Sequence, residues 1–355
     1  MKVLFCINTP AQAYTWQHIV ENLIRKGHKV RISARDYGST ARIFKTAGLP
    51  VHTFRPITRH YLRLFNIIVH IQNGLKASKG FTSTIIVGFG CDVAIIAALI
   101  RRPCLVFTDS EPIPLQHILT RLFASVIITP SCFNKELGKK HIRIKGYKEL
   151  AYLHPNSFKP DSSILKELGL AKYEKYVILR FNVFDAFHDI GKHGFTVADQ
   201  SSLVQELSKY ARVFISPEGP LAEELEGYRL SIPYERIHHA LYYAQLLVTD
   251  TQTMTTEAAI LGTPAVRFNS FVGSDDMGNF TELEEKYGLI YSFREADRAI
   301  QKAIELIQQP DLKEQWAKKQ QKLLTDTIDV TQFMVDFIEN YPDSIKEYKE
   351  KSNKL

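Results

Sequence analysis

The chain has 355 residues, of which 45% are hydrophobic and 23% are charged, values that exclude a largely disordered chain. This length favours two domains of ordinary size. The formal net charge is +7, but residues 1–155 carry 22 Lys and Arg against 7 Asp and Glu, whereas the rest carries 23 against 31. The basic first half suggests an anionic partner, and the alternative is that two oppositely charged halves attract each other.

Strands and helices alternate through the first half. Each apolar run is followed by a segment with helical spacing, and Gly27 and Gly48 stop two of the helices. This alternation is typical of a parallel, doubly wound sheet. We expect strands at residues 2–8, 28–36, 49–54, 82–90, 103–109 and 125–130, and helices at residues 13–26, 39–47, 92–100 and 114–123.

The alternation stops at residues 154–163, a run rich in Pro, Ser and Asn, and then starts again. The second half predicts strands at residues 175–181, 211–217, 246–250 and 264–269, and helices at residues 200–210, 237–244, 255–261 and 281–286, with mostly helix from residue 296. We therefore predict an α/β fold with two Rossmann-like domains, residues 1–155 and 165–330, followed by a C-terminal helix and tail, residues 331–355. In such sheets ligands bind beyond the carboxyl ends of the strands, so a cleft between two facing domains is the expected site.

Residues 248–266 carry the clearest chemical signal. A strand ends at Asp250, a hydroxyl-rich turn follows, and a short helix of small residues begins. The helix N-terminus and the hydroxyls suit a diphosphate, and a carboxylate one turn into the helix suits the two hydroxyls of a ribose. The alternative is an ordinary Thr-capped helix whose glutamate faces solvent. The candidate residues are Thr253, Thr255 and Thr256 for the diphosphate and Glu257 for the ribose.

A second block, residues 180–194, follows the first strand of the second half. Arg180 has the forked guanidinium that pairs with phosphate. His188 and His193 lack the His-Glu-x-x-His spacing of a zinc site, so no metal is expected. His188 is a candidate acid or base, and the alternative is a histidine bonded to its own loop.

Acidic residues also end two strands of the first half. Asp92 and Glu111 are candidate acid/base groups, although Asp92 equally suits the N-cap of helix 92–100. Asn8, Thr9 and Gln12 form the loop after the first strand. No Gly-x-Gly-x-x-Gly, phosphate-binding loop or Gly-x-Ser-x-Gly motif is found, which disfavours a dinucleotide-binding protein, a P-loop enzyme or an α/β-hydrolase.

A family resemblance rests on five segments spread over the chain. They are residues 7–12 (INTPAQ), residues 179–194 with LRF and AFHDIG, residues 217–221 (PEGPL), the Glu257 segment with Glu-Ala-Ala-x-x-Gly-x-Pro, and residues 267–280 with RFNSF and GNF. With these segments the chain resembles domain-of-unknown-function family 354, a GT-B-type family. It is also similar to the non-hydrolysing UDP-N-acetylglucosamine 2-epimerases and to the lipid-linked N-acetylglucosaminyltransferases.

The resemblance implies roles for the candidates. It places a UDP-sugar on Glu257 and the threonines, sugar hydroxyls on Asp276 and Asn279, and an acceptor beside the loop with Asn8, Thr9 and Gln12. The epimerases support His188, Asp92 and Glu111 as acid/base groups. Where they carry a further carboxylate, this sequence has Gln116 and His117, a departure that disfavours an epimerase.

Residues 55–79 interleave basic and apolar side chains. They predict either an interfacial helix on anionic lipid or a helix packed on the first sheet. No nucleic-acid recognition signature accompanies the basic residues. A cytoplasmic chain is expected, because residues 1–10 are too short for a signal peptide and the four cysteines show no Cys-x-x-Cys spacing. One alternative places it at the inner face of the membrane.

The leading hypothesis is a glycosyltransferase that uses a nucleotide sugar, with UDP as the expected nucleotide, in surface polysaccharide or glycolipid synthesis. Its acceptor is expected to be anionic or lipid-linked, and no tightly bound cofactor is expected. The alternatives are a UDP-sugar 2-epimerase and a non-catalytic sugar-nucleotide-binding module, and the oligomeric state stays open. The candidate acid/base residues are Asp92, Glu111, His117, His188 and His18.

Overall fold

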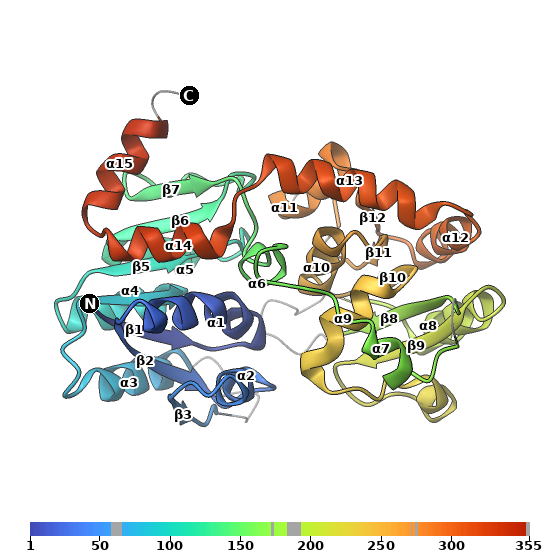
Figure 1. Cartoon of the computed structure of the whole chain (residues 1–355), viewed down its shortest axis with the longest axis horizontal. Coiled ribbons are helices and arrows are strands. Elements are labelled where there is room, and N and C mark those ends of the chain that lie inside the picture. The colour runs from blue at the N-terminus through green and yellow to red at the C-terminus, as the bar shows by residue number, and fades with distance from the viewer. Residues whose placement is uncertain (58–65, 172–173, 183–192, 271, 274–275, 353–355) are drawn as a thin grey trace. The chain divides into compact units, whose positions relative to one another are not determined.

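A computed structural model describes residues 1–57, 66–171, 174–182, 193–270, 272–273 and 276–352. The chain forms two compact units (Figure 1). Unit 1 comprises Met1–Ser157 and Thr327–Leu355, and unit 2 comprises Phe158–Asp326. The change from one unit to the other thus falls inside the Pro-, Ser- and Asn-rich run at residues 154–163. The C-terminal residues, which the sequence assigned to a separate helix and tail, pack with unit 1.

Unit 1 is built on a seven-stranded sheet in the order β3-β2-β1-β4-β5-β6-β7. All of its strand pairs are parallel. From β1 the chain adds β2 and β3 on one side, and from β4 it adds β5, β6 and β7 on the other. The switch point of the sheet therefore lies between β1 and β4. The strands are β1 (Lys2–Ile7), β2 (Lys29–Arg35), β3 (Val51–Phe54), β4 (Ile85–Phe89), β5 (Cys104–Phe107), β6 (Val126–Pro130) and β7 (His141–Ile144).

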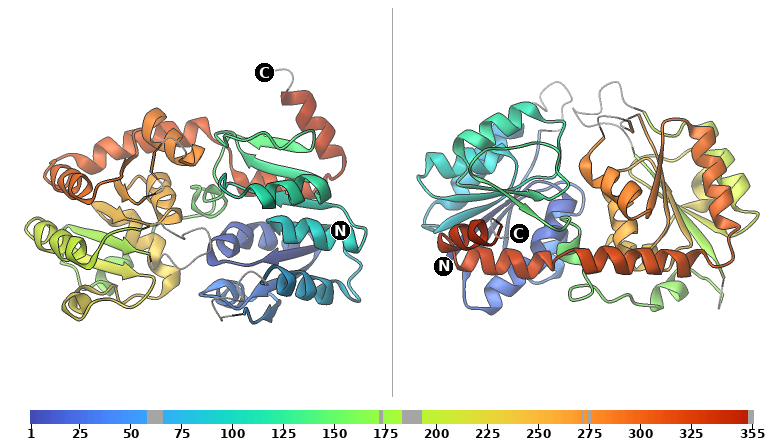
Figure 2. Two further views of the ribbon diagram at one scale, coloured as in Figure 1. Left: turned by 180° about the vertical axis from the view of Figure 1, so that it is seen from behind. Right: turned by 90° about the horizontal axis from the view of Figure 1, so that it is seen from above.

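Helices cover both faces of this sheet (Figure 2). The central strands are buried along their length, as expected for a parallel sheet with two covered faces. The helices of unit 1 are α1 (Pro10–Arg25), α2 (Thr40–Thr46), α3 (Asn66–Ser78), α4 (Cys91–Leu99), α5 (Pro114–Phe123), α6 (Leu150–Leu153), α14 (Val330–Glu339) and α15 (Asp343–Ser352). None of the helices in the described part of the chain is long and apolar enough to cross a membrane.

Unit 2 has a five-stranded parallel sheet in the order β12-β11-β10-β8-β9. Its switch point lies between β8 and β10. The strands are β8 (Tyr176–Phe181), β9 (Arg212–Pro217), β10 (Leu246–Thr249), β11 (Ala265–Phe268) and β12 (Ile290–Phe293). The helices are α7 (Ser163–Glu167), α8 (Val197–Leu207), α9 (Ile237–Tyr243), α10 (Thr253–Leu261), α11 (Gly278–Thr281), α12 (Ala296–Ile307) and α13 (Leu312–Asp326), with short turns η3 (Glu223–Tyr228), η4 (Tyr234–Arg236) and η5 (Glu282–Lys286).

Helix starts differ most from the sequence-based expectations. Helix α1 begins at Pro10, three residues early, because Thr9 caps its N-terminus and proline is favoured in the first turn. Helix α10 begins at Thr253 rather than residue 255 and ends where Gly262 adopts a left-handed φ of 72°. Strands β7 and β12 were not predicted, because β7 alternates two buried isoleucines with polar residues and β12 has one buried residue, so neither gives an apolar run.

Candidate functional site

The carboxyl ends of β8 and β10 meet at the switch point of unit 2. Beyond them lie Asp250 and the N-terminus of α10. The side chain of Gln252, the N-cap residue of α10, makes no capping hydrogen bond among the described residues. The first backbone N–H groups of a helix have no carbonyl partner within it, and they carry the positive end of the helix dipole. This turn is therefore suited to an anion.

The three predicted threonines of this turn differ in what their hydroxyls contact. Thr255 Oγ1 donates to the Thr251 carbonyl at 2.7 Å, and Thr256 Oγ1 accepts from Asn279 Nδ2 at 3.2 Å. The Thr255 hydrogen is thus used within the helix and is not available to a phosphate. Thr256 is only an acceptor in its contact and keeps its hydroxyl hydrogen, so Thr256 and the partly exposed Thr253 are the hydroxyl donors left beside the backbone N–H groups.

Glu257 lies one turn into α10 and is buried, with a 5% exposed fraction. Its Oε1 lies 3.0 Å from Nε2 of His238, a buried residue of α9. The ring of Phe158 meets the His238 ring edge-on. Sequence reasoning missed His238. The hydrogen bond orients the carboxylate, so Glu257 is a fixed acceptor rather than a solvated helix residue.

Asn279 and Asp276, the predicted sugar-binding residues, are held differently. Asn279 is buried and its Oδ1 has no hydrogen-bond partner among the described residues, so it has capacity for a ligand hydroxyl. The Asp276 carboxylate instead forms an ion pair with the fully buried Arg267, whose guanidinium also lies 3.8 Å from the centre of the Phe280 ring. This pair commits Asp276 to a structural contact.

Asp250 anchors the chain on both sides of the switch point. Its two carboxylate oxygens accept from the backbone N–H groups of Asn182, at 2.7 Å, and Phe195, at 3.2 Å. Burial raises the pKa of Asp250 to about 7, although these two hydrogen bonds act in the opposite direction. His188, a predicted acid or base, lies outside the described residues.

Arg180 at the end of β8 faces β9. Its guanidinium donates to Ser216, through the carbonyl at 3.1 Å and Oγ at 3.0 Å, and to Glu218 Oε1 at 2.6 Å. Its buried Nε has no partner among the described residues. A phosphate on Arg180 would therefore compete with Glu218, which sequence reasoning did not consider.

At the switch point of unit 1, Asp92 is held by two side chains from other elements. Its Oδ2 accepts from Asn8 Nδ2 at 2.8 Å and lies 3.6 Å from Nδ1 of His70, on α3. Nε2 of His70 is buried and has no partner among the described residues. The N-cap of α4 is Gly90, and Asp92 lies in the first turn of the helix rather than at the N-cap position expected as the alternative. This cluster of an amide, a carboxylate and an imidazole is the strongest acid/base candidate in unit 1.

The other two residues predicted for the first loop support its backbone. Thr9 Oγ1 accepts from the Gln12 N–H at 3.4 Å, and Gln12 Oε1 accepts from the Asn8 N–H at 2.8 Å. These bonds shape the loop that carries Asn8. His18, further along α1, pairs with Glu21 in a partly exposed contact.

Glu111 and His117 lie beyond the end of β5, and both are buried. Glu111 Oε1 accepts from the Asn134 N–H at 3.3 Å. His117 Nε2 lies 2.9 Å from the Ser110 carbonyl, so this nitrogen carries the ring proton, and burial lowers the pKa of His117. Both residues are thus bonded to neighbouring backbone.

A buried charge cluster next to them was missed by the sequence analysis. Lys148 forms ion pairs with Asp109, which follows β5, and with Glu149, at 2.9 Å. The two carboxylates raise the pKa of Lys148 against the opposing effect of burial. Burial raises the pKa of Glu149 to about 7, partly offset by Lys148. Because one lysine balances the charge of one carboxylate, the cluster is neutral only when Glu149 is protonated.

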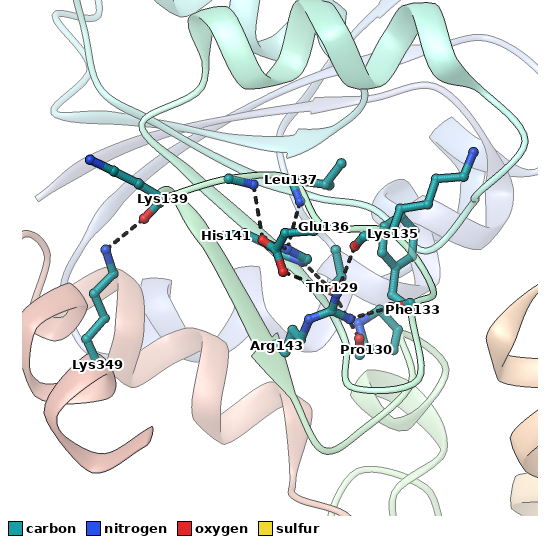
Figure 3. A network of polar contacts seen from close by, with 11 residues as sticks. Thr129, Pro130, Phe133, Lys135, Glu136, Leu137, Lys139, His141, Arg143 and Lys349 are labelled. Carbon is teal, nitrogen blue, oxygen red and sulfur yellow. Dashed lines mark hydrogen bonds and ion pairs between the residues drawn. The ribbon is translucent and has the colours of Figure 1, made fainter. Parts of the chain in front are cut away.

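The loop between β6 and β7 contains a further polar network (Figure 3). His141 Nε2 lies 2.8 Å from Thr129 Oγ1, and its Nδ1 lies 3.1 Å from both the Leu137 N–H and Glu136 Oε1. Nδ1 accepts from Leu137 when the ring is neutral and donates to Glu136 when it is charged. Burial lowers the pKa of His141, which favours the neutral ring.

The structure resembles several solved structures. It superimposes on the S. aureus MnaA–UDP co-structure with a TM-score of 0.70 and 13% identity, covering 97% of this chain and 98% of that one. It superimposes on UDP-GlcNAc 2-epimerase from Neisseria meningitidis bound to UDP-GlcNAc with a TM-score of 0.69 and 14% identity, covering 95% of this chain and 99% of that one. With CalG4, the calicheamicin glycosyltransferase, the TM-score is 0.59 and the identity 15%, and the superposition covers 96% of this chain and 98% of that one.

At these identities the likeness concerns the fold, and it confirms the predicted α/β fold class of GT-B type. No curated protein matches this chain in sequence. The model of one family, "Protein of unknown function (DUF354)", matches residues 2–343, which confirms the resemblance noted in the sequence. The chain belongs to this DUF354 family.

Proposed function

We propose that this protein is a glycosyltransferase whose donor is a nucleotide sugar, with UDP as the nucleotide, bound in unit 2. The observation that carries the proposal is the pairing of Glu257 with His238 one turn inside a helix whose N-terminus has no side-chain cap in the described part of the chain. A nucleoside diphosphate needs an anion site and, a few ångströms away, an acceptor for ribose hydroxyls. Helix α10 supplies both.

In this proposal each group has one task. The first-turn N–H groups of α10 and the Thr253 hydroxyl bind the diphosphate and stabilise its charge as it leaves. Glu257 accepts from the ribose hydroxyls, and Asn279 Oδ1 accepts from a sugar hydroxyl. Arg180 adds a cation if the diphosphate displaces Glu218.

Transfer also needs a base for the acceptor hydroxyl. Asp92 is the proposed base, because its carboxylate is buried and held by Asn8 and His70. The acceptor proposed here is anionic or lipid-linked, in keeping with the basic residues 1–155 and with a role in surface polysaccharide or glycolipid synthesis.

A UDP-sugar 2-epimerase is the second candidate. The same Asp92–His70 contact favours it, since an epimerase must remove and return a proton at a sugar carbon with groups in fixed positions. It would need no acceptor. The absence of a carboxylate at Gln116 and His117 argues for the transferase.

Nucleotide binding is tested first, by thermal unfolding with UDP, GDP, dTDP and their sugar conjugates. A ligand at about 100 times its dissociation constant adds about 2.7 kcal/mol of stability. We expect this stabilisation with UDP or a UDP-sugar, its loss in Glu257→Ala, and its retention in the exposed control Glu285→Ala. Equal stabilisation of both variants would remove Glu257 from the site.

Turnover then separates the candidates. UDP-GlcNAc is incubated with the protein, with and without a polyprenyl-diphosphate-linked glycan, and followed by NMR. UDP release that depends on the acceptor supports the transferase. A new UDP-sugar epimer formed without acceptor would select the epimerase. Binding without any reaction would select the non-catalytic module.

A further inference from the structure

Exposed apolar side chains of unit 1 gather on two neighbouring helices. Leu115, Ile118 and Leu122 follow one another at intervals of three and four residues on α5, so they lie on one face of that helix. Each is more than half exposed. The opposite face carries the buried His117 and Thr120. An amphipathic helix normally turns its apolar stripe toward the core, whereas the apolar stripe of α5 faces solvent.

Helix α4 extends this surface. The two helices pack against each other, and each returns from one of the adjacent parallel strands β4 and β5, so they run in the same direction and end at the same side of the sheet. At these ends lie Leu99, which is 60% exposed, and the partly exposed ring of Phe123. Large exposed side chains grouped in this way mark an interaction site rather than ordinary surface.

Four cationic side chains accompany this surface. Arg101 and Arg102 directly follow the last residues of α4, and Arg121 lies on α5; all three are exposed. Lys140 approaches from the β6–β7 loop and donates to the carbonyls of Arg121 and Leu122, both at 3.3 Å. Of the acidic residues nearby in sequence, Asp109 is paired with Lys148, Glu111 is buried, and Glu136 pairs with His141 and Arg143.

We propose that this α4–α5 face, made of Leu99, Leu115, Ile118, Leu122 and Phe123 with Arg101, Arg102, Arg121 and Lys140, docks on the surface of an anionic lipid bilayer. Apolar side chains that enter the headgroup boundary and cations that meet anionic lipids give the binding energy of interfacial helices. A second copy is a poorer occupant. A two-fold interface through this face would bring Arg121 and Lys140 close to the same cations of the other copy.

The proposal does not rest on the sugar-nucleotide site, because it uses residues of unit 1 only. It also differs from the interfacial segment expected at residues 55–79. Residues 58–65 of that segment lie outside the described part of the chain, and α3 packs Ile71 and Leu75 against the core. The α4–α5 face would hold the protein where lipid-linked sugars are found.

Vesicle co-sedimentation tests the proposal. The protein is mixed with vesicles of phosphatidylcholine alone or with about one third phosphatidylglycerol, which supplies the negative surface. We expect binding to the anionic vesicles only, and its loss at high salt because the charges are exposed. Ile118→Ser/Leu122→Ser should weaken binding by at least about tenfold. Arg102→Gln/Arg121→Gln should weaken it by about 25-fold, at about fivefold for each cation near the surface.

The matched control is Ile68→Ser/Val197→Ser, which removes two exposed apolar side chains from other helices. It should bind vesicles like the wild type. Binding lost in this control but kept in Ile118→Ser/Leu122→Ser would overturn the proposal, as would absence of wild-type binding. Sedimentation velocity adds a further test: a wild-type dimer that the Ile118→Ser/Leu122→Ser change dissociates would show that a second copy covers the face. UDP binding is measured on every variant and should not change, so failure of the donor site is seen separately.

Discussion

His238 on α9 holds the carboxylate of Glu257 on α10, with Nε2 and Oε1 3.0 Å apart and both side chains buried. A glutamate free to rotate would lose side-chain entropy on binding a ribose, whereas this one is already fixed. The pair therefore links the fold of unit 2 to the proposed nucleotide site.

Replacing His238 should weaken nucleotide binding through Glu257. In His238→Ala the carboxylate loses the hydrogen bond from His238, and a hydrogen bond to a charged group is worth about 1.5–3 kcal/mol. We expect UDP to bind roughly ten times more weakly by isothermal titration calorimetry, with circular dichroism unchanged. The adjacent His239→Ala is the matched control, because His239 stacks on Phe158 and its Nδ1 accepts from the Asp161 N–H. An unchanged UDP affinity in His238→Ala would show that His238 does not position Glu257.

Asp92 should be needed for turnover but not for UDP binding. Asp92→Asn keeps the shape of the side chain and removes its basicity. The loss of a general base costs about 10²–10⁴ in rate. We expect kcat to fall by this factor while the UDP affinity stays the same, since Asp92 belongs to the other unit. A variant with normal kcat would leave Asp92 a structural residue.

Asp250 should make the protein less stable as the pH rises. Its folded pKa, about 7, lies above the usual value near 4, so folding takes up a proton between these two values. The stability that this group contributes is complete below about pH 4 and is lost by about pH 8. In Asp250→Asn the fall in unfolding free energy over this range should shrink by about 2–4 kcal/mol, measured by urea unfolding. The exposed Asp297→Asn serves as the control, and an equal fall in both variants would contradict the assignment.

Lys148 should be needed to keep Asp109 and Glu149 buried. Lys148→Met leaves two carboxylates without their cation, and breaking a buried ion pair costs about 3–5 kcal/mol. The loss of unfolding free energy should be largest near about pH 8. It should be smaller near about pH 5, because the buried carboxyl groups take up protons there and no longer need the cation. Urea unfolding at both pH values checks this. A loss independent of pH would show that packing, not charge, explains the effect.

His141 should be neutral at neutral pH, with its proton on Nε2. That tautomer lets Nδ1 accept from Leu137 and lets Nε2 donate to Thr129 (Figure 3). Because burial lowers the folded pKa of His141, its contribution to stability is present above about pH 6.5 and is lost as the pH falls. Ring nitrogen shifts in NMR report the tautomer. Glu136→Gln should move the titration to lower pH, because the charged ring loses its partner, and a move to higher pH would contradict this account.

Much of the fold follows from local sequence. The parallel strands read as apolar runs because both faces of each sheet are covered, and Gly27, Gly48 and Gly262 mark helix ends through their left-handed φ values. Strands β7 and β12 were missed because neither is a run of buried apolar residues. The segment around Glu257 stood out because a strand end, a run of threonines and a helix start are adjacent in the chain.

The contacts that decide each site residue's state are not local. His70 is 22 positions from Asp92, and His238 is 19 positions from Glu257; both pairs form only when separate helices pack. The sequence predicted that Asp276 is a loop residue that binds sugar, but its carboxylate forms an ion pair with Arg267 at the end of β11. Composition and spacing give the residue types of a site, and packing determines which of them are already engaged.

Hydrogen–deuterium exchange with and without saturating UDP tests the central claim most directly, because the claim concerns backbone N–H groups. The account predicts slower exchange on UDP binding in the peptide that spans residues 251–262, in the wild type but not in Glu257→Ala. Protection confined to unit 1, or no protection at the start of α10 despite measured UDP binding, would contradict the proposed nucleotide site.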